Sequence, residues 1–133
     1  LYLRAKQLDY ANALVDEALL INPGNYPLMM KKADIMIAID RPEMASRLLT
    51  EVTEAKPLND AAWYQLAEAR GLAGDIIGVH QARAEYFLLN GDLERAEKQL
   101  SYAQPLARQN FQLSERIRNR LDEIRDLIEE LSR

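Results

Sequence analysis

Residues 57–67 read Pro57-Leu58-Asn59-Asp60-Ala61-Ala62-Trp63-Tyr64-Gln65-Leu66-Ala67, and the rest of the chain can be understood from this stretch. Pro57 is followed by the polar pair Asn59-Asp60 and then by a run that contains Trp-x-x-Leu-Ala. The proline and the last alanine recur 34 residues earlier, as Pro23 and Ala33. Ala11 and Ala45 show the same spacing. A fixed period of this length indicates repeated pairs of helices.

The repeat resembles the tetratricopeptide repeat, a helix–turn–helix unit with Trp, Leu, small residues, an aromatic residue and a closing Pro at set positions. Trp63, Leu66 and Ala67 fill the opening positions, whereas Lys32 stands where Leu is usual and Arg70 where Tyr is usual. The predicted fold is therefore all-α. We expect a tetratricopeptide-type solenoid of about seven full helices that ends in a capping helix.

The phase of the repeat changes after residue 74. The stretch 80–84, His-Gln-Ala-Arg-Ala, repeats the first-helix pattern 17 residues after Trp63, which is half a period. We therefore expect the helix near 76–89 to close one pair and to open the next. The predicted units of a single domain, 1–133, are a partial repeat at 1–23, repeats at 24–57 and 58–91, an overlapping pair at 75–108 and a capping helix at 110–132. The chain opens without Met, so we expect it to be part of a longer protein.

Local signals place the helix ends. The predicted helices span 1–6, 8–21, 26–39, 42–55, 60–73, 75–89, 92–104 and 110–132. The expected N-terminal caps are Asp60, Asp75 and Asp92. Pro42 suits a first helical turn, Gly74 and Gly91 suit left-handed helix exits, and Pro105 should end or kink the helix before it.

Composition excludes several kinds of function. The net charge is −4 and the pI about 5.1, so no nucleic-acid partner is expected. No apolar run approaches the ~18 residues of a membrane span, so no membrane insertion is expected. The chain has no cysteine and one histidine, His80, which leaves no set of zinc ligands. We expect no catalytic, cofactor-binding or metal-binding residue, and we expect His80 to pack between helices.

The candidate binding residues are those expected on the concave face, which the first helices of such an array line. They follow one position after the Trp position and one position after the small-residue position of each unit. The first set is Met30, Tyr64 and Gln81, the second is Asp34, Glu68 and Glu85, and Ile37 and Leu88 extend the same face. Because the second set is all carboxylate, the groove should bind apolar or basic extended protein segments and reject acidic tails. The alternative is that these acids pair with neighbouring arginines such as Arg83.

The last helix carries one apolar stripe. Its members are Ile117, Leu121, Ile124, Ile128 and Leu131. The stripe is typical of a helix that caps the end of a solenoid, in which case the chain should be a monomer. The alternative is a short coiled-coil seam between two copies. Two heptads are few for such a seam, so we favour the cap.

The stretch from Trp63 to Arg133 resembles the C-terminal end of the periplasmic β-barrel assembly-enhancing proteases of Gram-negative bacteria. The resemblance lies in the runs at 63–69, 82–86 and 91–96, in the half-period change between them, and in the closing helix. It implies a zinc metallopeptidase domain with a His-Glu-x-x-His motif upstream, and this array as the tail that docks on the outer-membrane β-barrel assembly machinery and its substrates. None of the zinc ligands of that family falls on this chain.

Two other functions remain open from the sequence. The array could be the adaptor or scaffold of an unrelated secretion or assembly complex, in which case a cytoplasmic location replaces the periplasmic one. It could also be a structural oligomerisation domain built on the last helix. All three interpretations predict a chain without an active site of its own.

Overall fold

The computed structural model describes residues 2–133 and contains, within them, seven α-helices and no strand. The prediction of an all-α fold is confirmed. In chain order the helices are α1 (Tyr2–Ile21), α2 (Tyr26–Ala38), α3 (Pro42–Ala55), α4 (Asp60–Leu72), α5 (Ile76–Leu89), α6 (Leu93–Leu106) and α7 (Phe111–Leu131).

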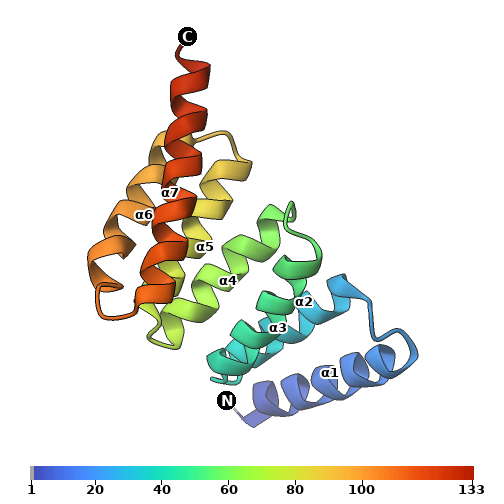
Figure 1. Ribbon diagram of the computed structural model, residues 1–133. Coiled ribbons are helices and arrows are strands. Elements are labelled where there is room, and N and C mark those ends of the chain that lie inside the picture. Colours follow the sequence, from blue (N-terminus) through green and yellow to red (C-terminus); the bar gives the residue numbers. More distant parts are fainter. Residues whose placement is uncertain (1) are drawn as a thin grey trace.

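The helices are stacked in the order of the sequence. All the extensive contacts join helices that are neighbours along the chain, from α1 with α2 to α6 with α7. Figure 1 shows this succession from the blue α1 to the red α7, whose last turns extend beyond α5 and α6. Such an arrangement buries most of the apolar face of each helix between its two neighbours.

Two large hydrophobic clusters fill the stack. The N-terminal core joins α1 to α5 and contains Val15, Ala33, Ile35, Met36, Ala45, Leu49, Leu66, Ala67, Ala69 and Ala82. The C-terminal core joins α5 to α7 and contains Ala84, Ala96, Leu100, Ala103, Ala107, Ile117, Leu121 and Ile124. The many alanines allow neighbouring helices to approach closely. The helix α5 belongs to both cores, and its register therefore decides which side chains it presents to α4 and which to α7.

Most of the predicted helix ends are confirmed to within one residue. The side chains of Asp75 and Asp92 accept hydrogen bonds from the backbone N–H of Gly78 and Arg95. Gly74 and Gly91 have φ values of 82° and 79°, the left-handed exits that were predicted. The expected cap Asp60 is wrong, because it is the first residue of α4 and Asn59 caps that helix. Asn59 is the better placed residue, since its carboxamide oxygen reaches the N–H of Ala62 at 3.1 Å.

Two boundaries differ from the prediction by more than one residue. The segments 1–6 and 8–21 are one helix from residue 2 onward, because no glycine, proline or cap interrupts the chain near Gln7; residue 1 lies outside the described residues. Pro105 lies inside α6, which ends at Leu106, two residues beyond the predicted end. A proline this close to the end of a helix removes a single backbone hydrogen bond, so the last turn survives it.

Two residues that depart from the repeat pattern have polar partners. Lys32 forms an ion pair with Asp16 of α1. The guanidinium of Arg70 donates to the carbonyl of Gly78 at 3.1 Å, and burial lowers its pKa although the nearby Asp75 opposes that effect. These polar contacts replace the apolar contacts that Leu and Tyr would make at the same positions.

The prediction that His80 packs between helices is confirmed. Its Nδ1 lies 2.8 Å from Oε1 of Gln99, and its ring lies 5.6 Å from that of Tyr102, with both partners on α6.

Candidate protein-binding surface

A cleft of about 410 Å³ opens between α4 and α5. Its lining residues are Tyr64, Ala67 and Glu68 from α4, and Arg83, Tyr86 and Phe87 from α5. Each helix contributes residues at positions i, i+3 and i+4, which share one face of a helix. The two faces turn toward each other because α4 and α5 pack closely along their length.

Aromatic rings form the floor and one edge of this cleft, which we call the α4–α5 cleft. The rings of Tyr64 and Tyr86 lie 5.3 Å apart and tilted, and those of Tyr86 and Phe87 lie 5.8 Å apart, edge to face. The guanidinium carbon of Arg95, on α6, lies over the Phe87 ring at 5.8 Å from its centre. Tyr64 remains 64% exposed despite its ring contact with Tyr86. The contacts therefore hold a large aromatic side chain in place while most of it still meets water.

Two charged side chains stand on opposite walls of the α4–α5 cleft. Glu68 of α4 and Arg83 of α5 are both exposed. Neither forms an ion pair with another residue of the described part of the chain. The cleft thus combines an apolar floor with one acidic and one basic wall.

Only some of the candidate binding residues that were predicted for the concave face line this cleft. Tyr64 and Glu68 line it. Asp34 is exposed beside α4 and accepts a hydrogen bond from Nε2 of Gln65 at 2.5 Å. The backbone carbonyl of Met30 accepts from the same Nε2 at 2.8 Å, and its half-buried side chain packs against the N-terminal core. Ile37 also packs against that core.

The remaining predicted residues lie on another side of α5. Glu85 accepts two hydrogen bonds from Arg120 of α7, at 2.7 and 2.9 Å, and this bonding raises the pKa of the guanidinium. Leu88 packs against the C-terminal core, and Gln81 is half-buried. Arg83 and Glu85 are two residues apart, which is roughly 200° around a helix. One of them therefore faces the α4–α5 cleft and the other faces α7.

Sequence reasoning missed Arg83, Tyr86 and Phe87 as cleft residues. A signal for them exists, because Arg83-x-x-Tyr86-Phe87 has the same i, i+3, i+4 spacing as Tyr64-x-x-Ala67-Glu68 on the preceding helix. The sequence rule chose residues by their distance from the Trp position of each unit. That rule selects another face of α5, where the phase of the repeat has changed.

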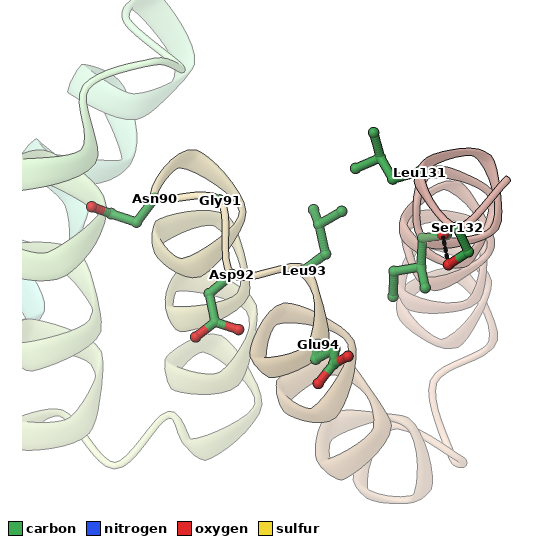
Figure 2. A pocket seen from close by; sticks show the side chains of 8 residues that line it. Asn90, Gly91, Asp92, Leu93, Glu94, Leu131 and Ser132 are labelled. Carbon is green, nitrogen blue, oxygen red and sulfur yellow. Dashed lines mark hydrogen bonds between the residues drawn. The ribbon is translucent and has the colours of Figure 1, made fainter.

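A second hollow, of about 480 Å³, lies at the far end of the stack (Figure 2). It is bounded by the turn between α5 and α6, the first residues of α6 and the last turn of α7. Figure 2 shows Leu93 directed toward α7, Asn90 directed away, and the hydroxyl of Ser132 donating to the carbonyl of Ile128. No aromatic ring lines this hollow, and its serine hydroxyl is already bonded. We therefore take the α4–α5 cleft as the candidate site.

The described part of the chain offers neither a metal site nor a helix that could cross a membrane. Within residues 2–133 no three His, Asp or Glu side chains are grouped so that they could hold a metal ion. None of the seven described helices combines the length and the apolar character that crossing a bilayer requires.

A model of the tetratricopeptide repeat family matches residues 2–76. The chain belongs to the tetratricopeptide repeat family. The matched part of this tetratricopeptide array covers α1 to α4 and stops at the first residue of α5, close to the point where the sequence phase changes.

Similarity to known structures supports the same fold over nearly the whole array. The solved structure of the "MamA RS-1 ArsTM double mutant" superposes with a TM-score of 0.60 at 16% sequence identity, over 92% of this chain and 68% of that one. At this identity the similarity concerns the fold alone. No curated protein matches the sequence.

Proposed function

We propose that this tetratricopeptide array is a non-catalytic module that binds an extended segment of another protein in the α4–α5 cleft. The observation that carries the proposal is Tyr64, which stays 64% exposed in a cleft with an aromatic floor while Tyr86 holds its ring. Exposed aromatic side chains in preformed hollows are the usual anchors of protein interfaces. A partner side chain that fills the cleft would remove this ring from water.

The proposal is tested with Tyr64→Ala and a matched control. Tyr10 of α1 is 69% exposed and lies outside the cleft, so Tyr10→Ala removes a similar exposed ring elsewhere. On an array of extended peptides with apolar and aromatic residues, Tyr64→Ala should weaken binding by about ten-fold or more, as expected for a loss of ~2 kcal/mol at an anchor. Tyr10→Ala should bind like the wild type. If Tyr64→Ala binds every peptide as well as the wild type does, the cleft is not the site.

For the parent protein we propose a periplasmic zinc metallopeptidase that acts in outer-membrane β-barrel assembly and quality control, with this array as its partner-binding tail. The support is the sequence resemblance of residues 63–133, whose second half lies beyond the part matched by the family model. The full-length gene product tests it directly. A signal peptide followed by a His-Glu-x-x-His domain is the expected result, and an upstream sequence with neither would favour a cytoplasmic adaptor of an unrelated complex.

A structural oligomerisation role through α7 is the less favoured alternative. Ile117, Leu121 and Ile124 are at most 1% exposed, because they pack in the C-terminal core of the same chain. The exposed large apolar side chains of α7 are Phe111, Leu127 and Leu131, at 76%, 39% and 74%; they lie at its two ends and do not extend the buried stripe into a continuous seam. We therefore expect sedimentation of the isolated chain to give the mass of a monomer, and a dimer dispersed by Leu127→Glu would support the alternative.

A further inference from the structure

The charges at the α4–α5 cleft restrict what can bind there. Glu68 and Arg83 line the same hollow from opposite helices, and both are exposed. A segment lying across the aromatic floor would pass between them. It would take water away from both charged groups at once.

A group that loses water without gaining a partner opposes binding, and a like charge beside it opposes binding further. A basic segment would satisfy Glu68 but place a cation near Arg83, and an acidic segment would do the reverse. A cleft with both walls would therefore not favour the basic segments that the carboxylates Asp34, Glu68 and Glu85 alone predict. Only a segment with both charges, one on each side of its anchor, gives Glu68 and Arg83 each a partner of opposite charge.

We propose that the α4–α5 cleft is specific for an extended protein segment that carries an aromatic anchor flanked by one basic and one acidic residue. The inference rests on the proposed function, because it concerns the same cleft. The anchor contacts Tyr64, Tyr86 and Phe87, the basic residue of the segment pairs with Glu68, and its acidic residue pairs with Arg83. Such a segment is recognised because it carries one charge of each sign and not because of a net charge of either sign.

The test uses labelled peptides of about nine residues with a central Phe, read by fluorescence anisotropy on the whole chain. Three sets differ only in the flanking charges, which stand one to three residues from the Phe: one Lys with one Glu, two Lys, or two Glu. We expect the mixed set to bind roughly three- to ten-fold more tightly than either uniform set, the range that exposed charge pairs provide. The difference should shrink at high salt, because added ions screen exposed charges.

Charge exchange on the protein gives the decisive comparison. Glu68→Lys makes both walls basic and should shift the preference to the two-Glu set, and Arg83→Glu should shift it to the two-Lys set. The double exchange restores opposite walls and should restore the preference for the mixed set. Glu43→Lys and Arg47→Glu on α3, which are exposed and outside the cleft, serve as controls and should change nothing.

The outcomes separate this inference from the function on which it rests. Peptides that bind through Tyr64 but ignore all three exchanges would overturn the charge specificity and leave the proposed function intact. A wild type that prefers the two-Lys set would also overturn the charge specificity. It would support the preference for basic segments that was predicted from Asp34, Glu68 and Glu85. If no peptide with a central Phe binds the wild type, both proposals fail together.

Discussion

Replacing Gly78 with alanine should destabilise the array, although alanine is the better helix former. Gly78 is a buried residue in the first turn of α5, and two neighbours use its backbone. Its N–H donates to Oδ1 of the capping Asp75 at 2.9 Å, and its carbonyl accepts from Arg70 at 3.1 Å. An added Cβ would lie 2.7 Å from Cδ of Arg70 and would overlap the Asp75 carboxylate. Both side chains would have to move.

The expected loss of stability follows from the interactions of Asp75 and Arg70 that this movement would break. Displacing Asp75 removes a helix cap, which contributes about 1 kcal/mol. Displacing Arg70 removes a hydrogen bond from a charged donor in a half-buried place, about 1.5–3 kcal/mol. The higher helix propensity of alanine offsets about 0.5–1 kcal/mol of this loss. We expect a net loss of about 2 kcal/mol in the free energy of unfolding, or roughly 6–8 °C in melting temperature for a chain of this length.

The matched control is Gly71→Ala, on the α4 side of the same turn. There the added Cβ would meet only Cγ2 of Val79, at 3.5 Å, which is an ordinary contact. This variant should be more stable than the wild type by about 0.5 kcal/mol, because only the propensity term remains. Urea unfolding followed by far-ultraviolet circular dichroism measures both changes. A Gly78→Ala variant that unfolds at the wild-type midpoint or above would refute the steric argument.

Four further predictions concern α7 and the absence of chemistry. A double-mutant cycle with Glu85→Gln and Arg120→Met should give a coupling of about 1 kcal/mol, because the paired side chains are only 21% and 35% exposed; a value near zero would contradict the contact. Leu121→Ala should cost about 2–5 kcal/mol of stability, whereas Leu131→Ala, at 74% exposure, should change it by less than about 0.5 kcal/mol. A chain cut after Gln109 should melt far lower or aggregate, since the buried face of α6 loses its cover; unchanged melting would show that α7 is not a cap. The dialysed chain should retain no stoichiometric zinc and should leave casein intact. Retained zinc or cleaved casein would contradict a purely binding role.

The helices were predictable from the sequence because their signals are local. A proline at Pro42, a glycine at Gly74 and a capping aspartate at Asp75 each act within a turn of their own position. The failures are local as well. Asn59 and Asp60 are both good caps, and only the backbone geometry shows that the asparagine is used. Asp40 makes a left-handed turn, at a φ of 62°, where no glycine marks it.

The cleft was only half predictable because it depends on the relative rotation of two helices. Tyr64 and Glu68 follow from the position of Trp63 in a regular unit. Arg83 and Tyr86 do not, because the face that α5 turns toward α4 is set by packing against both cores at once. The pairing of Glu85 with Arg120 joins residues 35 positions apart and has no short-range signal.

Packing between sequence neighbours also affects how such a protein can change through evolution. An inserted or deleted helix has to match mainly the two helices beside it, since the extensive contacts join sequence neighbours and single pairs such as Glu85 with Arg120 reach one helix further. A duplication of one helix, and not only of a helix pair, is therefore compatible with a folded chain. The 17-residue spacing between Trp63 and His80 is about the length of one helix with its turn, so it is what such an event would leave in the sequence. Arrays like this one can lengthen by one helix at a time. After each such step, the later helices change places between first and second positions of the repeat.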